Sequence, residues 1–118
     1  RDLFTLDLPG GRLRVCLAAT FVARARGLLL TACLPADHGL LILPCRSIHT
    51  MGMRYPIDAL FVDDRARIVD VRANLAPWRS AFSRDSSAVL ELASGAAAAF
   101  DLRLGDRLAE LVPLVAGR

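Results

Sequence analysis

The order of apolar and polar positions along the chain predicts two β-hairpins. Residues 4–8 alternate between apolar and polar side chains, and residues 12–17 alternate again after the turn sequence Pro-Gly-Gly. Further along, the apolar run at residues 57–62 is followed by an Asp-Asp turn and by renewed alternation over residues 69–74. Each pair of segments therefore has the length and the pattern of two strands joined by a short turn.

Three further segments are typical of single strands. Residues 40–43 form an apolar run bounded by Gly and Pro, and residues 88–92 are apolar apart from one acid. Residues 107–112 follow a Leu-Gly-Asp turn and are expected to form the last strand. By contrast, residues 44–56 have no clean period and residues 76–86 are mainly polar, so an irregular segment and a loop are expected there.

Two short helices complete the predicted elements. Residues 21–29 carry an apolar stripe at helical spacing behind Thr20, whose side chain suits the N-cap position. Ser94 precedes a second short helix over residues 95–100 in the same way. Many short strands joined by connections too short for crossover helices predict a mainly β fold, a jelly-roll-like antiparallel sandwich or barrel with two short helices.

Length and composition bound the class of protein. The chain has 118 residues, 54% of them hydrophobic, and a net charge of +3, so one core-rich domain spanning residues 1–118 is expected rather than a disordered chain. Its longest apolar runs, around residues 40–43 and 96–100, are far shorter than the roughly 18 residues that cross a bilayer. A soluble protein without a membrane span is therefore expected.

The cysteines favour a reducing compartment. Cys16, Cys33 and Cys45 are odd in number, and their spacing matches neither a disulfide framework nor a CxxC metal or redox motif. We expect free thiols. Because the chain also shows no apolar signal stretch, a cytoplasmic location is favoured slightly over export.

The distribution of basic residues predicts no nucleic-acid partner. All 15 are arginines, and many of them alternate with acidic or apolar residues instead of forming one stripe with stacking aromatics. The alternating arginines are Arg12, Arg14, Arg24, Arg26, Arg65, Arg67, Arg72, Arg103 and Arg107. The expected partner is a small ligand or another protein.

Several motifs in a fixed order resemble the domain-of-unknown-function family 192. They are Ala25-Arg26-Gly27-Leu28, Gly39-Leu40-Leu41, Tyr55-Pro56-Ile57-Asp58-Ala59-Leu60-Phe61-Val62-Asp63, Val89-Leu90-Glu91-Leu92, Gly95 and Leu104-Gly105-Asp106-Arg107-Leu108. The resemblance covers nearly the whole chain. It implies a small β-rich, jelly-roll-like fold found in bacteria and archaea, with some members exported, and it implies no established activity.

The chain departs from this family at one motif. Many members carry Trp-Met-Lys-Asn-Thr just before the Pro-x-Asp motif, whereas this chain has His49-Thr50-Met51-Gly52-Met53, which resembles a His-Thr-x-Gly-Met variant. Any role of that Trp or Lys therefore does not transfer to this chain.

Asp58 is the first candidate for chemistry because it interrupts an apolar strand. Burying its carboxylate without a partner would cost several kcal/mol. Arg54, Arg26 or backbone N–H groups of the irregular segment could supply that partner. Asp58 then either pins the irregular segment to the sheet by hydrogen bonds or takes part in catalysis or ligand binding.

Glu91 is likewise an acid within an otherwise apolar predicted strand. If residues 88–92 neighbour residues 57–62, Glu91 and Asp58 could form a carboxylate pair of the kind used by acid–base hydrolases. Otherwise Glu91 faces solvent. The sequence alone leaves it uncertain whether the protein is an enzyme.

The irregular segment holds a soft-ligand cluster. Cys45, His49, Met51 and Met53 lie within nine residues, joined by Cys16 or Cys33 if the fold allows, and such ligands suit Cu(I). The alternative is that the methionines fill gaps in the core.

A nucleophilic site can also be assembled on paper in the same segment. Ser47, Thr50 or Cys45 would supply the nucleophile, with His49 and Asp58 as base and orienting acid, but no signature such as Gly-x-Ser-x-Gly supports this arrangement.

The leading hypothesis is a non-enzymatic accessory module, which binds a small ligand or peptide through the loop at residues 44–58. Distinctive side chains concentrate in this segment of a regular scaffold, where binding residues usually lie. The candidate ligand-binding residues are Arg26, His49, Thr50, Arg54, Asp58 and Glu91. The alternatives are Cu(I) binding through His49, Met51 and Met53, and an acid–base hydrolase using Asp58 and Glu91.

Overall fold

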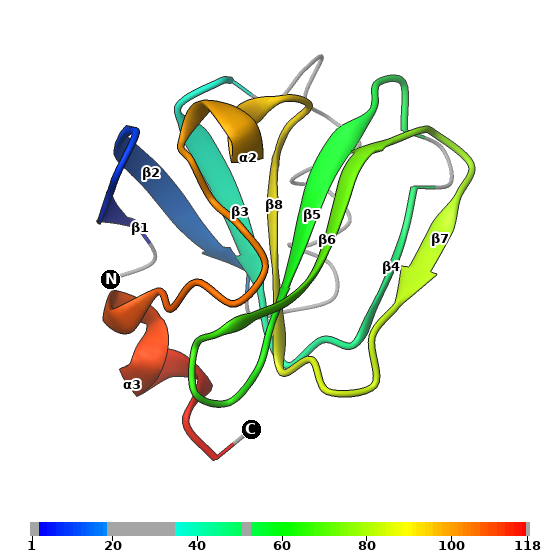
Figure 1. The fold of residues 1–118 in the computed structure, drawn as a ribbon. Helices are drawn as coiled ribbons and strands as arrows, with labels where there is room; N and C mark the ends of the chain where they lie inside the picture. Colours follow the sequence, from blue (N-terminus) through cyan, green and yellow to red (C-terminus); the bar gives the residue numbers. More distant parts are fainter. Residues whose placement is uncertain (1–2, 19–34, 51–52, 118) are drawn as a thin grey trace.

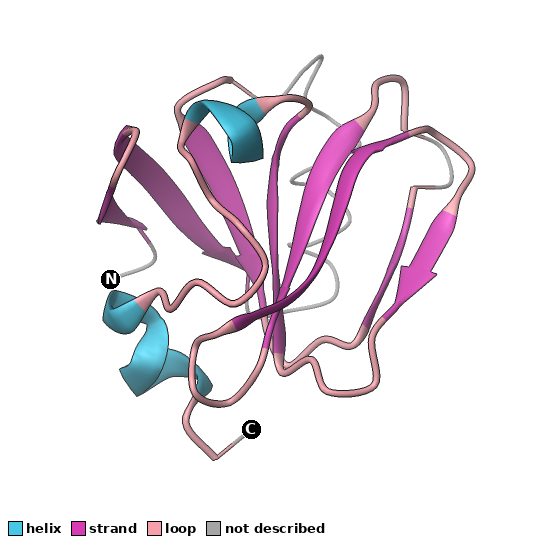
Figure 2. Cartoon of the chain, viewed as in Figure 1, coloured by secondary structure: helices cyan, strands magenta, loops and turns pink. Residues whose placement is uncertain are grey.

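The computed structural model describes residues 3–18, 35–50 and 53–117 of the chain. The predicted helix at residues 21–29 lies outside these residues. Strands dominate the described part, while helices are confined to one end of the sheet and to the C-terminal segment (Figures 1 and 2). The elements are β1 (Leu3–Leu8), β2 (Gly11–Ala18), β3 (His38–Ile42), β4 (Ser47–His49), β5 (Ile57–Val62), β6 (Ile68–Leu75), β7 (Ser80–Phe82), β8 (Ala88–Ala93), α2 (Ala96–Ala99), the 3-10 helix η1 (Ala109–Leu111) and α3 (Val112–Val115).

Six strands form one twisted sheet in the order β1-β2-β3-β8-β5-β6. The two predicted hairpins are confirmed as the antiparallel pairs β1–β2 and β5–β6, and the predicted single strands at the centre are β3 and β8. The expectation of an antiparallel sheet is wrong at one place, because β2 and β3 run parallel. Residues 19–37 join them, and a connection of this length is what a parallel crossover requires.

The remaining strands, β4 and β7, pair antiparallel in a separate two-stranded sheet, here called the ribbon. The ribbon lies beside β6 in Figure 1. The sequence pattern predicted an irregular segment and a loop at these residues. Strands of three residues are too short to establish an alternation, which explains why both were missed.

The large sheet buries both of its faces, which makes the fold sandwich-like and not a closed barrel. One face packs against α2 and the C-terminal segment, through residues that include Leu6, Leu13, Leu60, Leu90, Leu92, Phe100, Leu108, Leu111 and Val115. We call this the helix-side core. The other face packs against the ribbon, through Leu40, Ile42, Ile48, Met53, Ile57, Ala59, Phe61, Ala81 and Val89. We call this the ribbon-side core.

The C-terminal segment is helical where a strand was predicted. Arg107 makes a single bridge with Arg67, and η1 and α3 follow. Leu108, Leu111 and Val115 are buried at spacings of three and four residues, the period of a helix with one buried face. None of the helices in the described parts of the chain has the length and apolar character needed to span a bilayer.

Candidate functional site

The carboxylate of Asp58, on β5, is fully engaged by backbone groups. The residue is 1% exposed. Its Oδ1 accepts the N–H of Asn74 at 2.8 Å, and its Oδ2 accepts the N–H groups of Gly95 and Ala97 at 3.0 Å each. Backbone N–H groups thus supply the expected partner, but they belong to β6 and to the start of α2. Asp58 does not pin residues 44–56, and that interpretation is wrong.

The backbone around Asp58 is shaped to present these donors. The register between β5 and β6 shifts between Ile57 and Ala59, so that β6 carries an extra residue in a bulge. Asn74 lies there with a left-handed φ of 53°, and its Oδ1 accepts the hydroxyl of Ser94 at 2.7 Å. Ser94 therefore does not cap α2 as predicted, since the carboxylate of Asp58 fills that role from another strand.

Thr50 is a second buried polar residue whose hydrogen bonds all serve the fold. Its Oγ1 accepts the N–H of Arg79 at 2.7 Å and lies 2.7 Å from the carbonyl oxygen of Ala76, to which it can donate. The backbone of Thr50 adds bonds to Arg79 and Trp78. Thr50 is 0% exposed, so it fastens residues 76–79 to the end of β4 and is not available to a ligand.

Glu91, on β8, is an acid buried in apolar surroundings. It is 0% exposed, and neither carboxylate oxygen has a hydrogen-bond partner among the described residues. Its neighbours across the sheet are Leu40 on β3 and Ala59 on β5, both members of the ribbon-side core. Burial in these apolar surroundings raises the pKa of Glu91 to about 8. Glu91 is therefore mostly a neutral acid at pH 7, and the solvent-facing alternative is wrong.

Asp58 and Glu91 are not a carboxylate pair. Their strands are neighbours, as the pair required, but Asp58 is opposite Leu92 and Glu91 is opposite Ala59. Leu92 belongs to the helix-side core and Ala59 to the ribbon-side core, so the two acids face opposite sides of the sheet. The arrangement required for shared acid–base chemistry is absent.

The soft-ligand and nucleophile sets are also not assembled by the described residues. Met53 is buried in the ribbon-side core, whereas His49 is exposed on the other side of the ribbon. The thiol of Cys45 donates to the carbonyl oxygen of Ser47, and both oxygens of Asp58 are occupied as above. Met51, Cys33 and Arg26 lie outside the described residues. No group of three or more His, Cys, Asp or Glu that could hold a metal occurs in the described ranges.

The outer side of the ribbon carries exposed aromatic side chains. Ile48 and Ala81 are opposite one another and enter the ribbon-side core, so their strand neighbours His49 and Phe82 face outward. Phe82 is 59% exposed, and Trp78, in the turn before β7, is 63% exposed. These are the two aromatic residues classed as exposed within the described parts of the chain.

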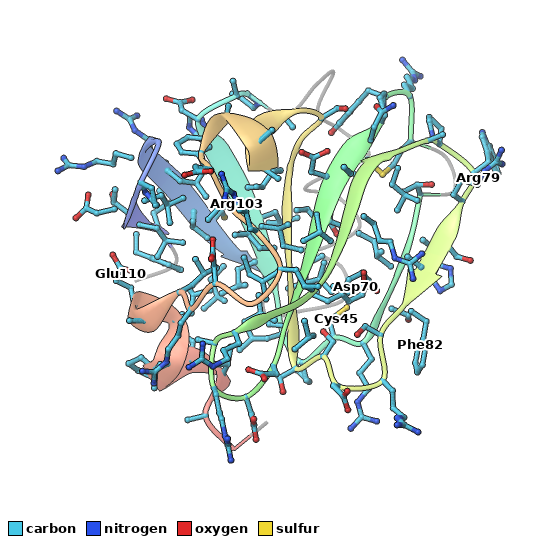
Figure 3. The ribbon with its side chains drawn as sticks, in the orientation of Figure 1. Cys45, Asp70, Arg79, Phe82, Arg103 and Glu110 are labelled. Atoms are coloured by element: carbon cyan, nitrogen blue, oxygen red, sulfur yellow. The ribbon has the colours of Figure 1, made fainter. Side chains whose placement is uncertain are left out.

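Four exposed arginines lie on the same stretches of chain as these aromatic residues or on the segment that contains the paired strand. Arg46, Arg54, Arg79 and Arg84 are all exposed, and Figure 3 shows Arg79 and Phe82 at the two ends of β7. Residues 44–56 and 76–87 contain these four arginines and one acid, Asp85. This part of the chain therefore carries a net charge of +3, equal to that of the whole protein. We call the exposed residues His49, Trp78, Phe82 and the four arginines the ribbon surface.

An open hollow of about 400 Å³ adjoins the ribbon where β4 begins and β7 ends. It is lined by Arg46, Arg84, Asp85 and the serines at positions 86 and 87, together with Asp63, Asp64 and Arg65 from the β5–β6 turn. Arg46 and Arg84 thus belong both to the hollow and to the ribbon surface.

Of the residues predicted to bind a ligand, the structure leaves His49 and Arg54 exposed, while Thr50, Asp58 and Glu91 are buried. Sequence reasoning missed Trp78, Arg79, Phe82 and Arg84 because they lie in what was predicted to be an unremarkable polar loop. The signal that could have found them was charge, since residues 76–87 and 44–56 are poor in acids while the rest of the chain is balanced.

Comparison with known proteins gives a family and a fold. The chain matches the model of family DUF192, described as an uncharacterised ACR, over residues 5–109. A protein of unknown function from Novosphingobium aromaticivorans is 26% identical with a TM-score of 0.74, covering 89% of this chain and 81% of that one. A candidate transcription regulator from Sinorhizobium meliloti is also 26% identical with a TM-score of 0.74. The match covers 87% of this chain and 88% of that one. No curated protein matches the chain.

Proposed function

The chain belongs to the DUF192 family, which has no assigned activity, and we propose that this member is a non-enzymatic binding module whose ligand contacts the ribbon surface. The observation that carries the proposal is the contrast between the two sides of one small ribbon. Its inner side is packed in the core through Ile48 and Ala81, while its outer side exposes His49 and Phe82, and the turn before β7 exposes Trp78. Aromatic side chains are enriched among the residues that carry binding energy at protein interfaces.

Hydrogen bonds fasten the part of the surface that carries Trp78 and Arg79. Thr50 joins the end of β4 to the turn that carries Trp78 and Arg79 through side-chain and backbone hydrogen bonds. Because this turn is already ordered before a ligand arrives, little conformational entropy is lost on binding. The candidate residue Thr50 thus supports the site and does not touch the ligand.

A binding role accounts for the acids better than catalysis does. Both oxygens of Asp58 accept backbone hydrogen bonds, and Glu91 lies within an apolar cluster with no described group in hydrogen-bond reach. A general acid or base must reach the proton that it transfers, which neither group does here. The relative from Sinorhizobium meliloti, described as a candidate transcription regulator, agrees with a binding role.

Trp78 provides a direct test because it is the one tryptophan of the chain. Its fluorescence would be recorded while the protein is titrated with four probes: a twelve-residue oligo(dT), a twelve-residue poly-Glu peptide, a poly-Lys peptide and an oligosaccharide. We expect at least one probe to change the emission of Trp78 with saturable binding. Phe82→Ala should weaken that binding, while Leu104→Ala should not, because Leu104 is 66% exposed but lies between α2 and η1.

The proposal fails if none of the four probes changes the emission at millimolar concentration. It also fails if a probe binds by calorimetry while the emission stays constant, since its site would then lie elsewhere. Equal weakening by Phe82→Ala and Leu104→Ala would likewise contradict a site on the ribbon.

A further inference from the structure

We infer that the ligand of the ribbon surface is a single-stranded nucleic acid, an inference that rests on the proposed binding function. Proteins that bind single strands combine aromatic side chains, on which bases stack, with basic groups that follow the phosphates. The ribbon surface has both features. Trp78 and Phe82 are more than half exposed, and four exposed arginines lie on the same short stretches of chain.

The two aromatic rings are exposed on neighbouring parts of the chain, where bases of one unpaired strand could stack on both. Phe82 projects outward from β7, and Trp78 lies in the turn that leads into this strand. Three residues lie between the two positions, so their Cα atoms are at most about 14 Å apart. Stacked bases inside a duplex could not reach these rings, so the surface suits an unpaired strand better than a double helix.

The arginines are free to contact phosphates. The side chains of Arg46, Arg54, Arg79 and Arg84 make no ion pair or hydrogen bond with any described residue. Three other arginines differ in this respect, since Arg12, Arg72 and Arg103 each pair with a nearby aspartate. Residues 44–56 and 76–87 thus carry a net charge of +3, and Arg46 and Arg84 among them share their hollow with Asp63, Asp64 and Asp85. Guanidinium groups bind phosphate oxygens in a bidentate manner.

An acidic peptide would interact with the arginines of the ribbon surface but not with its aromatic rings. Its carboxylates could pair with the arginines, but they would leave the rings of Trp78 and Phe82 exposed to water. Bases satisfy both features at once, because each nucleotide carries a flat ring and one negative charge. The aromatic residues therefore decide in favour of a nucleic acid.

The test is fluorescence anisotropy with a fluorescein-labelled oligo(dT) of twelve nucleotides, measured between 50 and 200 mM salt. Trp78→Ala and Phe82→Ala should each weaken binding by about tenfold, the effect of removing one stacking platform. If all four arginines contact phosphates, the logarithm of the affinity should fall with the logarithm of salt with a slope of about −3. Arg79→Ala and Arg84→Ala should each reduce that slope by about 0.7.

Matched controls separate this surface from the general positive charge. Arg103→Ala removes an exposed arginine that pairs with Asp101 on the C-terminal segment, and Leu104→Ala removes an exposed apolar side chain beside it. Figure 3 shows that Arg103 lies away from the ribbon. Neither control should change the affinity by more than about twofold.

Three results would overturn the inference: no binding of oligo(dT) at 50 mM salt, equal losses in the ribbon variants and in the controls, or tighter binding of a labelled poly-Glu peptide. The last result would leave the proposed function standing if poly-Glu also changed the emission of Trp78. The nucleic-acid inference can therefore fail while the binding function of the ribbon survives.

Discussion

Asp58 and Glu91 lie on neighbouring strands of the same sheet and face its opposite sides. Asp58 is opposite Leu92 in the helix-side core, and Glu91 is opposite Ala59 in the ribbon-side core. One carboxylate accepts three backbone N–H groups, and the other has no partner among the described residues. The two acids therefore have opposite effects on stability, and each effect can be measured.

Asp58→Asn should destabilise the protein by about 3 kcal/mol. An amide has one accepting oxygen in place of two, and its NH₂ group would face an N–H donor, so buried donors lose their partners. Urea unfolding measures the loss. Asp64→Asn is the matched control, because Asp64 is exposed in the β5–β6 turn and should change stability by less than 0.5 kcal/mol, the usual limit for surface substitutions. Equal stability of the two variants would contradict the structural role of Asp58.

Glu91 should make the protein less stable as the pH rises. Its pKa is about 8 in the folded state against an ordinary value of 4.5, so between these values the folded state binds one proton more than the unfolded chain. The stability that this proton contributes is fully present below pH 4.5 and is lost as the pH rises towards 8. The free energy of unfolding should fall by about 1.4 kcal/mol for each pH unit in this window.

Glu91→Met removes the carboxyl while keeping a flexible side chain of similar size. The variant should lose the pH-dependent slope of Glu91 and be more stable than the parent by about 3 kcal/mol at pH 7.5, because an uncompensated buried acid is replaced by an apolar group. Urea unfolding at pH 5, 6, 7 and 8 gives both quantities. Glu110→Gln, at an exposed position, serves as control. An unchanged slope in Glu91→Met would show that other groups set the pH dependence.

Thr50→Val should loosen the turn that carries Trp78. Valine keeps the shape of threonine but leaves the N–H of Arg79 and the carbonyl of Ala76 without the hydroxyl, which costs about 2 kcal/mol. Hydrogen exchange should accelerate at the amide of Arg79 more than in the central strands. Thr50→Ser retains the hydroxyl and should preserve slow exchange, whereas equal exchange in all three proteins would contradict this role.

Leu111→Ala tests the helical C-terminal segment. Leu111 is 0% exposed in the helix-side core, so its truncation leaves a cavity and should cost about 3 kcal/mol in urea unfolding. Leu104→Ala is the control, because Leu104 is 66% exposed. A loss below 1 kcal/mol for Leu111→Ala would show that this segment does not close the core.

Much of the large sheet could be predicted from the sequence because its strands show either an alternation of apolar and polar residues or a continuous apolar run. The hairpins β1–β2 and β5–β6 and the central strands β3 and β8 follow the expected pattern. The pattern of apolar and polar residues gave a wrong prediction in the C-terminal segment, where packing against the sheet decides the structure. Residues 107–112 were predicted as a strand, although the burial of Leu108, Leu111 and Val115 follows a helical period.

The site was predicted only in part, for two physical reasons. Periodicity does not give strand register, and the register decides that Asp58 and Glu91 face different cores. Periodicity also does not show which distant segments pair. Arg54 and Arg79 are far apart in sequence, but the hydrogen bonds of Thr50 join their segments. The prediction against a nucleic-acid partner was argued from other arginines, which alternate with acidic or apolar residues, and neither Arg54 nor Arg79 is among those.

The central claim, that the ribbon surface is the binding site and takes single-stranded nucleic acid, is tested most directly by two-dimensional ¹H–¹⁵N NMR of the protein titrated with oligo(dT). The account predicts saturable shifts of the amides of His49, Arg79 and Phe82 and of the Trp78 indole, with β1, β2 and α3 unchanged. Shifts centred on β1, β2 or α3, or a spectrum unchanged at millimolar oligonucleotide, would contradict it.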